Sequence, residues 1–148
     1  MLASAEVKET RTSRRRYAAA SAAWTGLILF SSTTLASELC DGAFARLYGA
    51  TLGKHSASQN AFELTHFLAE KGLHLTLFCV FGILMWQVFT LPRWPRIGAV
   101  LVAGLIVGTS SELLQTLFPG RDPAIRDVLV NGFGALLGTA ISISKSRD

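Results

Sequence analysis

The stretch IGAVLVAGLIVGTSSELLQTLF, residues 97–118, decides the fold class, because it is long and apolar and has Glu112 as its only charged side chain. A helix of about 20 mostly apolar residues crosses the ~30 Å hydrocarbon core of a bilayer. Residues 18–36, 72–91 and 125–143 form three further runs of spanning length. The 148-residue chain is 50% hydrophobic and 16% charged, whereas soluble domains carry charge on about a quarter of their residues. The sequence therefore predicts an all-α integral membrane bundle of about four transmembrane helices.

The segments around these runs complete the predicted organisation. Residues 1–17 form a basic N-terminal tail, residues 18–143 form the membrane domain, and residues 144–148 form a C-terminal tail. Residues 37–71 form the only long loop, predicted on the outer side. Its mixture of Gly, Ser, charged and aromatic residues has no clear periodicity. It leaves room for a short interfacial or re-entrant element near residues 44–52.

Basic residues orient the bundle, because cytoplasmic segments of membrane proteins carry an excess of Lys and Arg. If the N-terminus is cytoplasmic, nine of the 14 basic residues lie inside and five lie outside. The expected arrangement therefore has both termini in the cytoplasm. The inside residues are Lys8, Arg11, Arg14, Arg15, Arg16, Arg93, Arg96, Lys145 and Arg147, and the outside residues are Arg46, Lys54, Lys71, Arg121 and Arg126.

An alternative for the N-terminus is a cleaved signal. The sequence SRRRY at residues 13–17 precedes an apolar run, and TLA at residues 34–36 resembles a small-residue cleavage site. Arginines are expected before a first membrane helix in any case. A retained first helix is therefore the preferred interpretation.

Composition and motifs argue against soluble and nucleic-acid functions. The net charge of +4 comes from the basic cluster before the first span, so no nucleic-acid partner is expected. The chain has no P-loop, no GxGxxG after a strand and no paired CxxC motifs. Cys40 in the loop and Cys79 inside the second span should lie at different depths. No disulfide is predicted.

Two polar stripes run along the third and fourth spans. Spacings of three and four residues place each stripe on one helix face, with its polar pair toward the outer side and its glycines deeper. We expect the glycines of the two helices to face one another and to allow close packing. The stripes are Gly104, Gly108, Glu112 and Gln115 on the third span, and Asp127, Asn131, Gly134 and Gly138 on the fourth.

Packing alone could explain small-residue patterns and polar groups that bond between helices. Glu112 and Asp127 favour more than packing, because an ionisable group at membrane depth costs several kcal/mol unless paired or hydrated. On the second span, Lys71, His74, Phe78 and Gly82 share a face, so His74 should enter the same pocket. A lone histidine is more often a satisfied hydrogen-bonding residue than a catalyst. Nearby carboxylates favour proton transfer here.

A metal site is an alternative use of the second span. Glu63, His66, Glu70 and His74 follow helical spacing and could present oxygen and nitrogen ligands together. A solvated helix face, with Glu63 and His66 in water, is the preferred interpretation. No metal ion or other cofactor is therefore expected.

The polar residues can be given roles in a site that opens to the outer side. His74 or Glu112 would be the general base, and Asp127 would orient it. Arg121 could clamp a phosphate or carboxylate, or could instead pair with Asp127 or Glu112. No nucleophile stands out among Ser31, Ser32, Ser110 and Ser111, and attack by water or a substrate hydroxyl is equally open. The candidate catalytic residues are His74, Glu112 and Asp127, and the candidate substrate-binding residues are Lys71, Gln115, Arg121 and Asn131.

Taken together, these motifs resemble the VanZ-like family. The C-terminal motif is Glu112-x-x-Gln115-x-x-Phe118-Pro119-Gly120-Arg121, followed by Asp127-x-x-x-Asn131-x-x-Gly134-x-x-x-Gly138. The second span matches with Lys71-x-x-His74-x-x-x-Phe78-x-x-x-Gly82, and Leu29-Phe30-Ser31-Ser32 ends the first span. The resemblance implies a bacterial envelope protein of the cytoplasmic membrane, related to a namesake linked to teicoplanin resistance. It also implies kinship with predicted membrane enzymes that act on lipid head groups.

Three functions compete. The first is an enzyme that transfers or hydrolyses the head group of a phospholipid or lipid-linked envelope precursor. The second is a non-catalytic protein that sequesters a glycopeptide or such a precursor. The third is a proton-coupled transporter, which would need oligomerisation because one small unit shows no inverted repeat. Substrate, reaction and oligomeric state stay open at this point.

Overall fold

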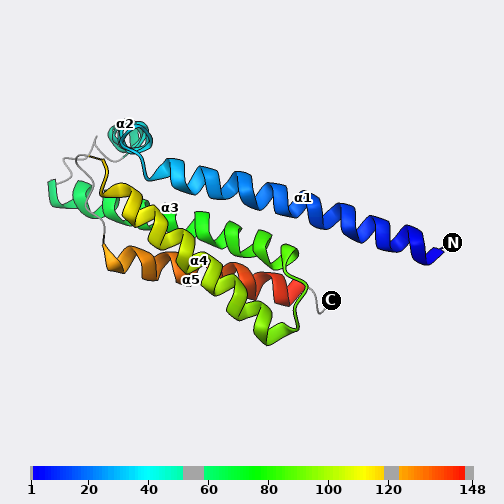
Figure 1. The fold of residues 1–148 in the computed structure, drawn as a ribbon. Helices are drawn as coiled ribbons and strands as arrows, with labels where there is room; N and C mark the ends of the chain where they lie inside the picture. The colour runs from blue at the N-terminus through cyan, green and yellow to red at the C-terminus, as the bar shows by residue number, and fades with distance from the viewer. Residues whose placement is uncertain (1, 52–58, 119–123, 146–148) are drawn as a thin grey trace.

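The computed structural model describes residues 2–51, 59–118 and 124–145, which form helices joined by short connections (Figure 1). No strand occurs in these ranges, so the all-α prediction is confirmed. The helices are α1 (Leu2–Ser31), α2 (Thr34–Thr51), α3 (Gln59–Val88), α4 (Arg93–Gln115) and α5 (Ile125–Lys145).

Three of the helices, α3, α4 and α5, are long and apolar enough to cross a membrane. Residues 11–31 of α1 and α2 qualify together as a fourth span, bent by 77°. Large apolar side chains such as Ile106 and Phe133 are exposed, whereas polar Asn131 and Ser111 are fully buried. This distribution is the one expected of a bundle surrounded by lipid.

The first predicted span, 18–36, does not exist as one straight helix. Helix α1 ends at Ser31, and α2 begins at Thr34. Hydroxyl groups satisfy the backbone at this break, because Thr33 Oγ1 accepts the Ala36 N–H at 3.4 Å, as an N-cap residue does. The hydroxyl of Ser32 donates back to the Ile28 carbonyl at 3.3 Å.

Other boundaries also differ from the prediction. The basic tail at 1–17 is helical from Leu2, and most of the predicted loop at 37–71 is helix, in α2 and the first turns of α3. The second, third and fourth spans, predicted at 72–91, 97–118 and 125–143, correspond to α3, α4 and α5 with shifted ends. Helix α2 was difficult to predict from the sequence, because its amphipathic pattern is weak.

Helix α1 lies against α3 in the opposite direction. The Trp24 indole Nε1 donates to the Leu77 carbonyl at 2.8 Å, and Arg14 Nε donates to the Val88 carbonyl at 3.0 Å. Ile28 of α1 is buried with Phe78 and Phe81 of α3. The contact thus fixes the end of α1, and with it the start of α2, near the middle of α3.

Helices α3 and α5 run parallel and in close contact. A Cβ atom added at Gly138 would overlap the Cys79 carbonyl, and one added at Gly82 would overlap the Ala135 backbone. A Cβ at Gly134 would lie 2.7 Å from the Leu75 carbonyl oxygen. These glycines therefore allow the two backbones to approach where any side chain would hold them apart.

The expected pairing of the glycines across α4 and α5 is wrong. Gly134 and Gly138 face α3, whereas Gly104 and Gly108 of α4 face Ala135 and Asn131 of α5. Helix α5 uses separate faces for its two neighbours, because it lies between them. Each glycine stripe therefore packs against larger residues on the opposing helix.

Replacing Gly138 by Ala should push α3 and α5 apart, because the added methyl group overlaps the Cys79 carbonyl. We expect the free energy of unfolding in detergent to fall by about 1–3 kcal/mol, measured as a lower thermal midpoint. The matched control is Gly98→Ala on α4, where an added Cβ meets nothing within 4 Å. It should leave the midpoint unchanged or slightly raised. Equal losses in both variants would contradict the close contact.

Candidate functional site

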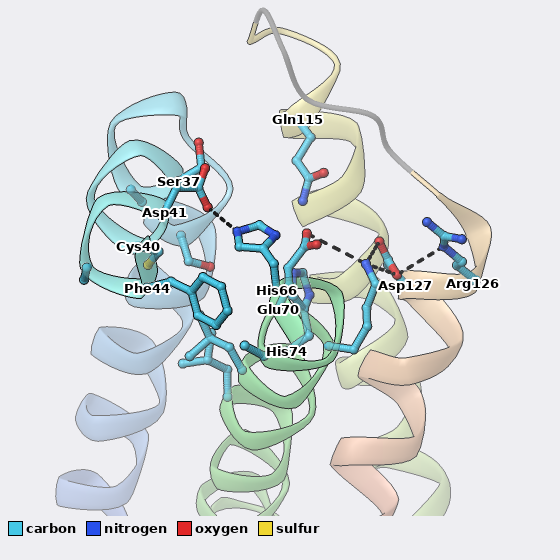
Figure 2. A pocket seen from close by; sticks show the side chains of 17 residues that line it. Ser37, Cys40, Asp41, Phe44, His66, Glu70, His74, Gln115, Arg126 and Asp127 are labelled. Carbon is cyan, nitrogen blue, oxygen red and sulfur yellow. Dashed lines mark hydrogen bonds and ion pairs between the residues drawn. The ribbon is translucent and has the colours of Figure 1, made fainter. Parts of the chain in front are cut away.

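A pocket of about 570 Å³ lies where α2, the middle of α3, the end of α4 and the start of α5 meet. Figure 2 shows its side chains converging from these helices. Four residues predicted to form the site line it, namely Lys71, His74, Gln115 and Asp127. Two more, Glu112 and Asn131, are buried without lining it. Arg121 lies outside the described residues.

Lys71 and Asp127 form an ion pair at the inner wall of the pocket. The lysine Nζ lies 2.8 Å from Asp127 Oδ1 and 2.9 Å from Oδ2. The two side chains are 14% and 6% exposed. The Asp127 carboxylate bonds Lys71 in the structure, and its role in orienting or tuning a catalytic base stays a prediction.

One turn further along, His74 Nδ1 lies 3.2 Å from Asn131 Oδ1. With that amide oxygen as acceptor, Nδ1 carries the proton, and Nε2 is free to accept one. Asn131 is fully buried, whereas His74 lines the pocket. The geometry therefore fixes the imidazole ring from behind and presents it to the cavity.

Glu112 supports the start of α5. Its Oε2 accepts the backbone N–H of Ala124 at 3.0 Å, directly before the helix begins at Ile125. A carboxylate near a helix N-terminus is stabilised by the helix dipole. Within the described ranges its second oxygen, Oε1, has no hydrogen-bond partner. Glu112 thus holds α5 in place and lies behind the pocket, so His74 is the better placed of the two candidate bases.

Helix α2 contributes side chains to the pocket that were not predicted from the sequence. Asp41 Oδ1 accepts a hydrogen bond from His66 Nε2 at 2.9 Å, and Phe44 lies edge-on to the His66 ring with centroids 5.0 Å apart. Cys40, Asp41 and Phe44 all line the pocket. The spacing of Ser37, Asp41, Phe44 and Tyr48 by four, three and four residues is a helical signal that could have revealed this face.

The row proposed as metal ligands is divided by the structure. His66, Glu70 and His74 line the pocket, whereas Glu63 is exposed and bonds Gln59 at 3.4 Å. His66 is only partly exposed and is paired with Asp41, so the expectation that it lies simply in water is wrong. In the described part of the chain, no three metal-ligating side chains are grouped.

Two of the candidate serine nucleophiles are part of the helix packing. Ser32 and Ser111 share a hydrogen bond of 2.6 Å, and both are 1% exposed. Neither lines the pocket, whereas Ser31 does. This hydrogen bond joins the end of α1 to α4 and holds the bend between α1 and α2 beside the pocket.

The two cysteines are free, so the predicted absence of a disulfide is confirmed. Cys40 is exposed, and Cys79 is partly buried in α3. Because Cys40 also lines the pocket, the labelling rate of its thiol can report whether the pocket is occupied.

Comparison with known proteins adds one finding. A family model described as VanZ/LLP1 matches residues 17–145, which includes every residue that builds the pocket. No curated protein and no solved structure matches the chain. The resemblance seen in the motifs is therefore supported over nearly the whole length.

Removing the partner of a buried charge should be costly, and Asp127→Asn removes the partner of Lys71. We expect the free energy of unfolding to fall by about 3 kcal/mol in thermal unfolding in detergent. Lys71→Met combined with Asp127→Asn should lose less than the two single changes together. Arg126→Gln is the control, because that guanidinium is 68% exposed and 3.9 Å from Asp127. Strictly additive losses would contradict a direct Lys71–Asp127 interaction.

Proposed function

The chain belongs to the VanZ/LLP1 family, and on that premise we propose that it binds and modifies the head group of a phospholipid or lipid-linked precursor in the bacterial cytoplasmic membrane. The observation that carries the proposal is the Lys71–Asp127 pair beside His74, lining a pocket at one end of a bundle with an apolar exterior. Ionisable groups in membrane helices mark functional sites, because their desolvation is costly. A lipid can bring its head group to such a site while its tails stay in the bilayer.

His74 is the residue we propose as general base. Nε2 would take the proton from a water molecule or hydroxyl group as its oxygen attacks the phosphorus of the substrate. The bond from phosphorus to the leaving oxygen would break, and the same proton would return to that oxygen. Asn131 would hold the ring in the required orientation through the 3.2 Å contact. The phosphate oxygens would be bound by Gln115 and by the cations Lys71, Arg121 and Arg126.

Non-catalytic sequestration of a glycopeptide or a lipid-linked precursor is the second candidate. It is favoured by the pairing of Asp127 with Lys71, because among the described residues no carboxylate then forms a hydrogen bond or ion pair with His74. The same pocket would then recognise a ligand without turnover. Incubation of the purified protein with candidate lipids would separate the two functions, because only an enzyme releases product.

The proposal is tested by comparing the lipids of cells that lack the protein with cells that express the wild type, His74→Ala or Glu63→Gln. Membrane abundance is matched first. We expect a head-group change with the wild type and with Glu63→Gln, whose side chain lies outside the pocket. The rate of that change should fall about 10²-fold with His74→Ala, as for the loss of a general base.

Two results would count against catalysis. One is an unchanged lipid composition with the wild type. The other is full retention of the head-group change in His74→Ala. With either result, sequestration becomes the preferred function if the purified protein still binds lipid.

A further inference from the structure

The pocket has an acidic side and a basic side. Asp41 of α2 lies on one side, and Lys71 and Arg126 lie with Asp127 on the other (Figure 2). Glu70 of α3 lies between them, with its Oε1 3.8 Å from the Lys71 Nζ. The side chains of Asp41 and Glu70 are 57% and 40% exposed, so they are accessible to a ligand. Because Lys71 is held by Asp127, Arg126 is the more available cation, with its side chain 68% exposed.

The balance of these charges limits the ligand. The described lining residues include two cationic side chains, Lys71 and Arg126, and three anionic ones, Asp41, Glu70 and Asp127. Because the Glu70 carboxylate lies 3.8 Å from the Lys71 Nζ, an anionic group bound by the lysine also lies near negative charge, which is unfavourable for a purely anionic head group. A head group with one charge of each sign complements both sides.

Gln115 adds a hydrogen-bonding side chain to the pocket. The residue is 6% exposed and lines the pocket, and its side chain points inward from the end of α4 (Figure 2). Its amide atoms are not among the fully buried polar atoms that lack a hydrogen-bond partner, so they are accessible from the cavity and can meet water or a ligand there. Its N–H groups can donate to a phosphate oxygen.

The acidic side also has an aromatic wall. Phe44 lies three residues after Asp41, lines the pocket and packs against His66, which bonds the Asp41 carboxylate. The hydrogen bond holds the carboxylate in place, and the ring face attracts an ammonium group. Leu73 and Leu77 supply an apolar lining where the glycerol and the first carbons of the acyl chains can lie.

We propose that the pocket selects a zwitterionic glycerophospholipid whose head group carries an ammonium. The phosphate lies against Arg126 and Gln115, and the ammonium lies against Asp41 and Glu70 beside Phe44. This inference rests on the proposed function and names its substrate class. The cavity of about 570 Å³ is in the range of pockets for small ligands, so it takes the head group and leaves the tails in the membrane.

Cys40 provides the measurement, because this exposed thiol lines the pocket. Full-length protein carrying Cys79→Ala is purified in detergent micelles, and the rate of maleimide labelling is followed. The micelles contain no lipid, phosphatidylethanolamine, or phosphatidylglycerol with the same acyl chains. Each rate is divided by that of the same variant without lipid, which removes any effect on intrinsic thiol reactivity.

In the protein that carries only Cys79→Ala, we expect phosphatidylethanolamine to slow labelling about fivefold more than phosphatidylglycerol does. A factor of this size corresponds to one partly exposed charge interaction. Asp41→Asn and Glu70→Gln should each reduce this preference while some protection remains. Glu63→Gln is the matched control, because it removes the same charge from α3 outside the pocket. It should keep the full preference.

The outcomes separate this inference from the proposed function. Equal protection by both lipids, or stronger protection by phosphatidylglycerol, would overturn the zwitterion inference and leave lipid binding in place. Protection by neither lipid would overturn both. A full preference in Asp41→Asn and Glu70→Gln would show that the acidic side does not select the ammonium, and would also overturn the inference.

Discussion

The contact between the backbones of α3 and α5 is the constraint on which the site depends. Gly134 and Gly138 lie against the α3 backbone at Leu75 and Cys79, where a side chain would not fit. Because the two helices run parallel, this register repeats toward the pocket, where Lys71 meets Asp127 and His74 meets Asn131. Glycines deep in the bundle thus position charged and polar groups at its end.

The other helices complete the site around this pair. Glu112 of α4 bonds the backbone at the start of α5, and Ser111 beside it bonds Ser32 at the end of α1. The break after Ser31 turns the chain so that α2 forms one wall of the pocket. Consecutive residues of α4 therefore anchor both elements that border the cavity.

The sequence predicted the membrane bundle and most of the polar wall, because apolar length and helical spacing are local properties. Lys71, His74, Gln115 and Asp127 reach the pocket from stripes visible in the sequence. The partner of each glycine stripe could not be predicted, because a small-residue face shows that something packs there without showing what. The wall containing Asp41 was missed because it depends on a bend that hydroxyl groups stabilise.

The parallel contact of α3 and α5 can be tested with a cysteine pair in native membranes. His74 Nδ1 of α3 lies 3.2 Å from Asn131 Oδ1 of α5, so His74→Cys with Asn131→Cys should be joined by a short bifunctional thiol reagent once Cys40 and Cys79 are replaced by Ala. Mass spectrometry of the digested protein detects the linked peptides. We predict efficient linkage for this pair and none for His74→Cys with Leu129→Cys, where Leu129 is 66% exposed on α5. Absence of the first link, or equal yields from both pairs, would contradict the parallel contact.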